Sequence, residues 1–509
     1  MRISRPTLWD ELFQLPDQPA LTLQARLRSA VVREILAGRI SPGAPLPSSR
    51  DLARLMRLSR NTVTAAYQQL VDEGYLQARP RSGIFVAHGV VPASVPPPPA
   101  LAGAVGGQAP DWSARVLRSL TGRPTLAKPE RWRDYRYPFV YGGHDPQLFP
   151  TEDFRECCAR SLARAQLPNW TPDFETDDVP DLVEQIRLQL LPKRGVFALA
   201  EEIVVTVGAQ QAFHLLADAL FGVQSRVGFE EPGYPHARNS FALREPRWVP
   251  VPVDGEGVVL DALPPLDYLF VTPSHQSPTT ATLSLARRRQ LLAWAERDDI
   301  VVIEDDYESE NLYEGAPMPA LKSMDRSGRV VYIGSLSKSL SPAVRLGYVV
   351  APRALAAELR VLRHAMVRHP SAFLQQAYAL FVSLGHHESH ARRVNQAMQA
   401  RMALAADALR QHLPDFQFAL PQGGGSLWVQ APAWVDAAEL ALIARRHGVL
   451  IEAGDVFFAK PPYPCPYFRL RLSSIATGQI EAGLRALGQA ATELAQARGV
   501  ARSAPALPP

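Results

Sequence analysis

The stretch GSLSKSLSPAVRLGY, residues 334–348, directly follows the apolar run VVYI and decides the fold expected for the second half of the chain. Lys338 stands among small hydroxyl residues, and Arg345 follows it by seven positions. A phosphorylated aldehyde cofactor needs an amine for its aldehyde and a cradle of hydroxyl and cationic groups for its phosphate. The stretch therefore predicts a site for pyridoxal 5'-phosphate (PLP) centred on Lys338.

From about residue 135 onward, apolar strands alternate with helices, as parallel α/β folds require. Four other apolar strands run into polar turns, in VVTVGAQQAF, GFEEPGYP, LFVTPSHQSP and VVIEDDYESE. Because the carboxyl ends of parallel strands meet at one edge of a sheet, we expect these turns to form a single ligand site. The chain lacks a dinucleotide-binding glycine fingerprint and a P-loop lysine motif, which disfavours a nucleotide ligand.

The chemistry of PLP gives the residues of these turns their expected roles. Asp305 can lie against the pyridine nitrogen and keep it protonated, and Tyr307 can reach the ring oxygen. Tyr234 can stack on the ring. The expected phosphate partners share a hydroxyl, a guanidinium or a backbone N–H at a helix N-terminus: Ser335, Ser337, Arg345, Gly208, Ala209 and Gln210. Each residue alone has an ordinary structural explanation, so the prediction depends on their combination.

The positive charge of the chain is concentrated near its beginning. The whole chain carries a formal charge of +4, whereas residues 21–87 contain ten arginines and no lysine against four acidic residues, a net charge of +6. The remainder therefore carries −2. This asymmetry indicates a local surface for a polyanion, although a solvated arginine-rich face would give the same count.

The pattern within this segment favours a DNA-binding fold. A first helix places Leu23, Leu27, Ala30, Val31 and Ile35 on one apolar stripe before Gly38 ends it. A second begins at the capping box of Ser48 and Asp51, and a third runs from an N-cap at Ser59 to Gly74. YLQARPRSGIFVA then reads as two short strands around a tip. Three helices followed by a β-wing predict a winged helix-turn-helix over residues 15–87.

In such a motif the last helix enters the major groove with its N-terminus first. Arginine suits a guanine edge, while serine and threonine more often hold phosphates. Arg50 is expected to clamp the backbone, and Arg81 lies at the tip of the wing. The remaining DNA-contact candidates share the first turns of the last helix: Ser59, Arg60, Asn61, Thr62 and Thr64. A small helical module for protein interaction is the alternative.

Residues 88–110 separate the two halves. They contain no Asp, Glu, Lys or Arg and include a run of four prolines, so they offer no periodic apolar face. Chain of this kind is extended and semi-rigid and could span roughly 70 Å. We therefore predict a linker over residues 88–134; a ligand for a proline-recognising domain is the less favoured reading.

The bulk composition limits the remaining classes. With 47% hydrophobic and 20% charged residues, the chain is typical of soluble globular proteins. It shows no secretory signal and no run long enough to span a bilayer. Its three cysteines are too few and too poorly spaced for a disulfide framework or a zinc site. A cytoplasmic protein without a metal or a membrane partner is expected.

Both halves resemble known families. Residues 35–86, from ILAGRISP to SGIFV, resemble the GntR family of winged-helix regulators nearly position by position, and residues 135–490 resemble fold-type I (class I/II) aminotransferases. The whole chain is similar to the MocR subfamily of GntR regulators, whose phrases EEPGYP, TPSHQ, IEDDYESE and SLSKSLSPAVRLGY it contains. The resemblance implies an α/β aminotransferase-like domain over residues 135–495, with a smaller C-terminal α+β subdomain over about 385–495.

The resemblance also implies further site residues. Arg471 is the position that receives a ligand carboxylate, with Arg469 as its rival because residues i and i+2 of a strand share a face. Where aminotransferases read Asn-Pro-Thr-Gly, this chain reads Ser277-Pro278-Thr279-Thr280, so the asparagine that supports the ring oxygen is missing. Gln276 is the expected substitute.

Together these patterns favour a PLP-dependent transcription regulator. The resemblance implies a homodimer whose Lys338 holds the cofactor as an internal aldimine, and an amino-acid-like or amine ligand, or PLP itself, would act by exchange at this lysine. A functioning aminotransferase with an accessory DNA-binding domain remains the main alternative. A DNA-binding protein with an inert, merely dimerising second half is disfavoured because Lys338, Asp305 and Arg345 are all present.

Overall fold

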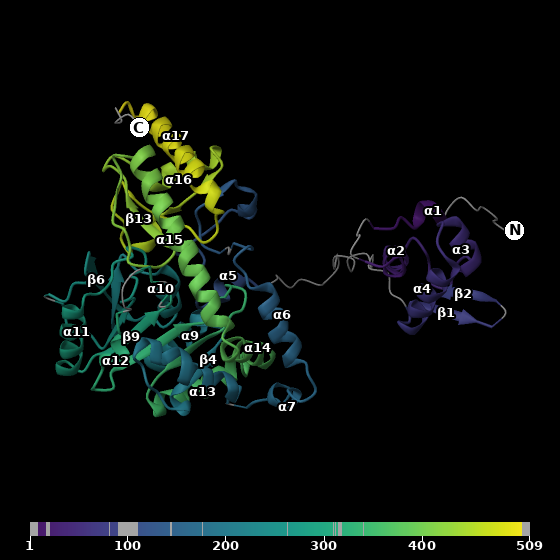
Figure 1. Ribbon diagram of the computed structural model, residues 1–509, viewed down its shortest axis with the longest axis horizontal. Coiled ribbons are helices and arrows are strands. Elements are labelled where there is room, and N and C mark those ends of the chain that lie inside the picture. The colour runs from purple at the N-terminus through teal and green to yellow at the C-terminus, as the bar shows by residue number, and fades with distance from the viewer. Residues whose placement is uncertain are drawn as a thin grey trace. The chain divides into compact units, whose positions relative to one another are not determined.

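The computed structural model (Figure 1) describes residues 9–16, 21–80, 82–89, 110–142, 145–175, 177–261, 263–308, 310, 312–313, 318–338 and 340–500. By its contacts the chain divides into two compact units, Met1–Arg115 and Val116–Pro509.

The first unit is the winged helix-turn-helix that the sequence predicts. Its helices and strands are α1 (Trp9–Leu12), α2 (Leu23–Leu36), α3 (Ser49–Leu55), α4 (Arg60–Asp72), β1 (Leu76–Arg79) and β2 (Gly83–Val86), followed by the short helix α5 (Trp112–Arg115). The Ser48 side chain caps α3 by accepting from the Asp51 N–H, and the Ser59 side chain caps α4 by accepting from the Thr62 N–H. Strands β1 and β2 pair antiparallel as the wing.

A single core holds this unit together. Leu27, Val31 and Ile35 of α2 pack against Val63, Ala66, Tyr67 and Leu70 of α4. Leu23, which the periodicity places on the same apolar stripe, is instead 48% exposed because it lies at the first residue of α2. Arg81, predicted at the wing tip, lies outside the described residues.

The second unit is built on an eight-stranded mixed sheet in the order β4-β11-β10-β9-β8-β5-β6-β7. Strands β6, β5, β8, β9 and β10 are parallel neighbours, whereas β11 runs antiparallel to both β10 and β4. The strands are β4 (Ile203–Thr206), β5 (Arg226–Glu231), β6 (Arg247–Asp254), β7 (Gly257–Val258), β8 (Tyr268–Val271), β9 (Val301–Asp306), β10 (Val330–Ser335) and β11 (Gly347–Val350).

Helices cover both faces of this sheet (Figure 1). Neighbouring strand residues alternate between the two faces: Ile303 packs with α9, α10 and α13, whereas Val302 packs with α11 and α12 on the other side. Burial on both faces explains why these strands read as continuous apolar runs. The helices are α6 (Thr151–Ser161), α7 (Leu167–Trp170), α8 (Pro180–Gln185), α9 (Gly208–Leu220), α10 (Pro235–Ala242), α11 (Leu285–Arg297), α12 (Leu321–Met324), α13 (Arg353–Val367) and α14 (Ala372–Ser383).

The C-terminal part of the unit has a separate four-stranded antiparallel sheet, in the order β12-β13-β16-β15. Its own hydrophobic core includes residues of the helices α15, α16 and α17. A two-stranded parallel pair, β3 with β14, joins residues 137–138 to this subdomain. The elements are β3 (Tyr137–Pro138), α15 (His386–His412), β12 (Gln417–Phe418), β13 (Ser426–Gln430), α16 (Ala437–Arg446), β14 (Val449–Leu450), β15 (Glu452–Ala453), β16 (Tyr467–Arg471) and α17 (Ile480–Arg498).

The predicted linker is only partly described. Residues 90–109 lie outside the described residues, whereas the end of the predicted linker packs with the second unit. There Lys128 Nζ donates to the Tyr141 carbonyl at 2.6 Å. Among the residues that the structure describes, no helix is both long and apolar enough to cross a membrane.

The core of the first unit generates a stability prediction. Leu27→Ala removes a fully buried side chain and should lower the local free energy of unfolding by about 2–5 kcal/mol. Leu23→Ala, on the same helix but exposed, should change it by less than about 0.5 kcal/mol. Hydrogen–deuterium exchange of the α4 amides in the full chain measures this opening. Equal effects of the two variants would contradict the assigned packing.

Candidate functional site

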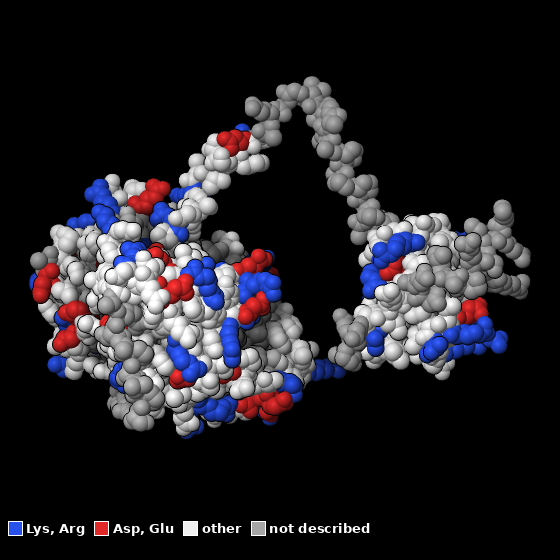
Figure 2. Space-filling model, turned by 90° about the horizontal axis from the view of Figure 1, so that it is seen from above, with Lys and Arg blue, Asp and Glu red and all other residues white. Residues whose placement is uncertain are grey.

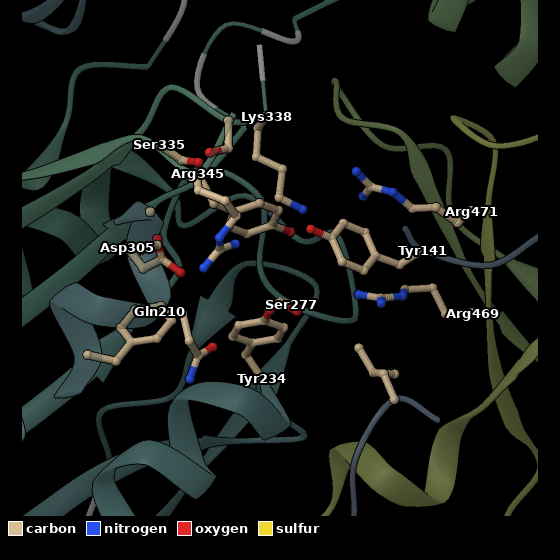
Figure 3. Close-up of a pocket in the computed structure, with 16 residues that line it drawn as sticks. Tyr141, Gln210, Tyr234, Ser277, Asp305, Ser335, Lys338, Arg345, Arg469 and Arg471 are labelled. Carbon is tan, nitrogen blue, oxygen red and sulfur yellow. The ribbon is translucent and has the colours of Figure 1, made fainter. Parts of the chain in front are cut away.

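One cavity of the second unit brings together residues that are far apart in sequence. It opens at the edge of the large sheet and is walled by residues of both subdomains (Figure 3). Its empty space, counted to the open mouth, is about 730 Å³. The lining residues are Leu126, Tyr141, Gly208, Ala209, Gln210, Phe213, Tyr234, Ser277, Asp305, Tyr307, Ser335, Ser337, Lys338, Arg345, Arg469 and Arg471.

The strand ends position these side chains. Asp305 is the last but one residue of β9, Lys338 follows β10 by three residues, and Gly208 begins α9 just after β4. Tyr234 precedes α10, which follows β5. Arg471 ends β16 and therefore reaches the cavity from the small sheet. Ten of the eleven residues expected to hold the cofactor thus line one cavity, as do both candidate carboxylate-binding arginines.

At the end of the cavity that is expected to hold the phosphate, backbone atoms lie close to the Arg345 guanidinium. Gly208 has φ +68°, and a Cβ on it would lie 3.4 Å from the Arg345 guanidinium. A Cβ on Gly347 would lie 3.1 Å from the Ala209 nitrogen. The Arg345 Nη2 donates to the Val207 carbonyl at 3.2 Å. These contacts set a guanidinium beside the N-terminus of α9, an arrangement suited to an anion.

Of the two serines expected to hold the phosphate, Ser337 has its hydroxyl engaged by the turn that follows it. Ser337 Oγ donates to the Leu346 carbonyl at 3.0 Å and accepts from the Leu346 N–H at 2.9 Å. Ser337 therefore fixes the turn that carries Arg345. Ser335, at the end of β10, lines the cavity directly.

Asp305 is the residue that most clearly lacks a partner. Its side chain is buried, and its Oδ1 makes no hydrogen bond to any described residue. Burial raises the pKa of Asp305 to about 8, although the nearby charge of Lys338 acts in the opposite direction. A buried carboxylate oxygen without a donor is costly. A protonated pyridine nitrogen would supply that donor, so the residues present fit PLP.

Lys338 lies among aromatic rings and other cations. Its Nζ is 4.2 Å from the centroid of the Tyr141 ring and 5.3 Å from that of Tyr307. Burial, together with the positive charges of Arg471 and Arg469, lowers the pKa of Lys338 to about 7, and the negative charges of Glu308 and Asp305 act in the opposite direction. The amine is therefore substantially neutral near pH 7, as a nucleophile must be.

The two arginines of β16 each carry a buried counter-charge. Arg469 Nε donates to Glu452 Oε2 at 2.7 Å, and Arg471 pairs with Glu308. Figure 3 shows both guanidinium groups directed into the cavity, with the Tyr141 ring between them and its hydroxyl directed toward Lys338.

Gln276 is the predicted residue that the structure does not bring to the cavity. Its amide nitrogen donates to Glu230, to the Pro232 carbonyl and to the Ser277 carbonyl, and its oxygen accepts from Thr279. These bonds turn the side chain into the protein, and Ser277 lines the cavity instead. The sequence offered no reason to prefer one neighbour, because Glu230 and the Pro232 carbonyl, which help to hold Gln276, lie more than forty positions away in the chain.

Besides Ser277, three lining residues were not predicted from the sequence: Leu126, Tyr141 and Phe213. Leu126 lies in the segment interpreted as linker. Tyr141 follows β3 and reaches the cavity because β3 pairs with β14 of the small subdomain. Only Phe213 carried a sequence signal, since it follows Gly208 by five residues in the same motif.

The candidate DNA-binding residues that the structure describes lie at the start of α3 and at the start of α4. Arg50, Arg60, Asn61 and Thr64 are exposed, whereas the Thr62 hydroxyl is held by the Ser59 hydroxyl at 2.8 Å. Figure 2 shows arginine side chains on the visible face of this unit, which contains no lysine. The first turn of α4 thus presents exposed polar side chains around Arg60, as a recognition helix requires.

Comparison with known proteins supports both halves. Residues 23–86 match "Bacterial regulatory proteins, gntR family", and residues 179–487 match "Aminotransferase class I and II". The chain is 40% identical to the HTH-type transcriptional regulator TauR of Rhodobacter capsulatus, over 92% of this chain and 96% of that one. It is 33% identical to the probable rhizopine catabolism regulatory protein MocR of Rhizobium meliloti, over 75% and 76%.

The chain belongs to the MocR subfamily of GntR-family transcription regulators. Another relative, the HTH-type pyridoxine biosynthesis transcriptional regulator PdxR of Corynebacterium glutamicum, is 31% identical over 80% of this chain and 83% of that one. Within this MocR-type chain the second unit has the aminotransferase fold.

A solved structure shows that likeness. The α-aminoadipate aminotransferase LysN of Thermus thermophilus, complexed with N-(5'-phosphopyridoxyl)-L-leucine, covers 76% of the MocR-type chain and 99% of its own, with a TM-score of 0.69 and 27% identity. The second unit of this regulator and an enzyme thus share one fold.

The lowered pKa of Lys338 generates a pH prediction. Because the neutral amine fraction rises as pH passes through about 7, trace acetylation of Lys338 in cofactor-free protein should rise between pH 6 and 8 and then level off. Peptide mass spectrometry measures the rate, with the exposed Lys193 as reference in the same digest. A rate that keeps climbing about tenfold per unit to pH 10 would contradict the described surroundings of the amine.

The exposed start of α4 generates a DNA prediction. If Arg60 reads a guanine, Arg60→Ala should cost about 1–3 kcal/mol at one position of the site and relax the preference there. Arg50→Ala, as a phosphate contact, should weaken binding to all sequences equally and reduce the salt slope by about one unit. Fluorescence anisotropy with in vitro selected DNA measures both. Unchanged specificity in Arg60→Ala would exclude Arg60 from base readout.

Proposed function

We propose that this regulator binds PLP through Lys338 and adjusts its action on DNA when an amine or amino-acid-like ligand enters the cavity. The observation that carries the proposal is the meeting of Lys338, the unpartnered Asp305 Oδ1 and the Arg345 guanidinium in one cavity. When bound, PLP supplies an aldehyde that bonds amines reversibly and a ring that withdraws electrons.

Different residues of the cavity would hold different parts of PLP. Lys338 would bind the aldehyde carbon, Asp305 would accept from the ring nitrogen, and Tyr307 would reach the ring oxygen. Tyr234 would pack against the ring. The phosphate would be held by Arg345, Ser335 and the backbone N–H groups at the start of α9, with Ser337 fixing the turn.

The ligand class follows from what faces Lys338 across the cavity. Arg471 and Arg469 come from the small sheet, whereas Lys338 and Asp305 come from the large one. A ligand with an amine and a carboxylate would therefore bond to both subdomains at once. Such a ligand has a higher affinity for the arrangement in which the spacing of the subdomains lets it bond to both. This difference in affinity is the condition for shifting a regulator between two states.

The proposed regulation would involve two copies of the chain. Helix-turn-helix proteins commonly bind two half-sites as dimers, so a change within each second unit could alter how two first units engage DNA. We therefore propose a homodimer that binds an operator with two half-sites.

A second candidate function is transamination by the same cavity. Lys338 has a pKa of about 7, so its amine could both accept and return a proton near neutral pH. A steady-state assay with an amino acid and a keto acid, run beside the DNA assay, separates sensing from turnover.

Lys338→Ala tests the proposed function. The variant should bind selected DNA as the wild type does, because the first unit is unchanged, but it should lose the borohydride-fixed cofactor on this residue. It should also lose any change in DNA affinity that amino acids or amines cause in the PLP-loaded wild type. Anisotropy and peptide mass spectrometry provide the two measurements.

Lys193→Ala serves as the matched control, because it removes an exposed lysine of the same unit. It should retain both the fixed cofactor and the response. If Lys338→Ala still responds to the same amines with the wild-type amplitude, the signal enters elsewhere and the proposed function is wrong.

A further inference from the structure

Glu308 forms a buried ion pair with Arg471 beside the cavity. The two side chains are 2% and 7% exposed. Arg471 Nη1 also donates to Ser426 Oγ at 2.8 Å, and the Gly425 N–H donates to Glu308 Oε2 at 3.2 Å. The guanidinium that would receive a ligand carboxylate therefore already holds a carboxylate of the chain itself.

Arg471 nevertheless has an unused donor. Its Nε is buried and makes no hydrogen bond within the part of the chain that the structure describes. The same side chain lines a second, smaller cavity together with Lys338, Glu308 and the apolar Leu148, Val394 and Met398. A ligand with its amine at Lys338 and its carboxylate at Arg471 would therefore bring that carboxylate close to the negative charge of Glu308.

We propose that Glu308 is an internal competitor for the ligand carboxylate at Arg471, and that a carboxylate ligand binds by displacing it. This rests on the proposed function for the position of the ligand amine at Lys338, but the exchange of carboxylates at Arg471 does not require the cofactor. Glu308 thereby lowers the affinity of Arg471 for anionic ligands, because a ligand must bind Arg471 better than the Glu308 carboxylate does.

A displaced Glu308 has another partner nearby. The His275 Nδ1 is buried and makes no hydrogen bond to a described residue. A Cβ on Gly424 would lie 2.9 Å from Glu308 Oε2 and 3.9 Å from His275 Nδ1, so both atoms border the same glycine. A neutral histidine with its proton on Nδ1 can donate to a carboxylate. Glu308 can therefore leave Arg471 without becoming a buried charge that lacks any hydrogen bond.

The neighbouring pair, Arg469 with Glu452, differs in a way that makes it the control. Its two residues lie directly opposite each other on adjacent strands of the small sheet. The second oxygen of Glu452 accepts from the Tyr141 N–H at 2.8 Å. Glu308, by contrast, follows β9 of the large sheet and pairs with an arginine of the small one. Of these two arginine pairs of β16, Glu308–Arg471 is the one that links the two sheets and can respond to their spacing.

The test uses propionate and propionamide, which have similar shapes but differ in charge and lack an amine that could react at Lys338. Glu308→Gln in the full chain should raise the affinity for propionate at least about tenfold, because Arg471 loses its competing charge. The affinity for propionamide should stay within about twofold of the wild type. Isothermal titration calorimetry measures both, in PLP-loaded and in cofactor-free protein.

Three further variants keep the test decisive. Glu308→Asp retains the charge but shortens the reach to Arg471, so it should raise propionate affinity by a smaller factor and guards against misfolding of Glu308→Gln. The double variant Glu308→Gln/Arg471→Gln removes both charges and should lose the gain. Glu452→Gln, which removes the partner of Arg469, should raise propionate affinity by a smaller factor than Glu308→Gln does.

The outcomes separate the two proposals. No gain in either Glu308 variant, an equal gain for propionamide, or an equal gain in Glu452→Gln would overturn the role of Glu308. A protein that fails to retain PLP would overturn the proposed function, while the titration of the cofactor-free protein would still decide the role of Glu308.

Discussion

Burial of charge at the edge of the large sheet is the constraint on which the second unit depends. An ionised side chain that leaves water needs an opposite charge or a full set of hydrogen bonds. Arg194 meets this need with Asp306 at 2.8 Å, and Arg363 with Asp178 at 2.6 Å. Each pair joins segments that are more than a hundred residues apart in the chain. The pairs therefore fix the strand ends on which the cavity is built.

Against this background the incompletely paired groups stand out. Asp305 has a buried oxygen without a donor, and burial lowers the pKa of Lys338, as do the positive charges of Arg471 and Arg469. Buried groups whose pKa values are shifted in this way mark ligand sites more often than structural ones. The same constraint explains Glu308, since an arginine held ready for a ligand carboxylate must be neutralised while that ligand is absent.

The division of the cavity between two sheets relates the site to regulation. The large sheet contributes Lys338 and Asp305, and the small sheet contributes Arg469 and Arg471. A group that bonds to only one sheet favours no particular spacing of the subdomains. A ligand that bonds to both does, and the free energy of that preference is what a regulator can transmit.

The sequence by itself determined the two folds and most of the site. Capping residues, apolar periodicity and polar turns after apolar strands are local signals, and they placed the winged helix and the Asp305, Lys338 and Arg345 motifs. Only the tertiary structure decided that Gln276 is held away from the cavity, that Tyr141 lines it and that Arg471 pairs with Glu308. These depend on contacts between residues that are tens to hundreds of positions apart, and neither composition nor spacing along the chain encodes which buried charge will reach which partner.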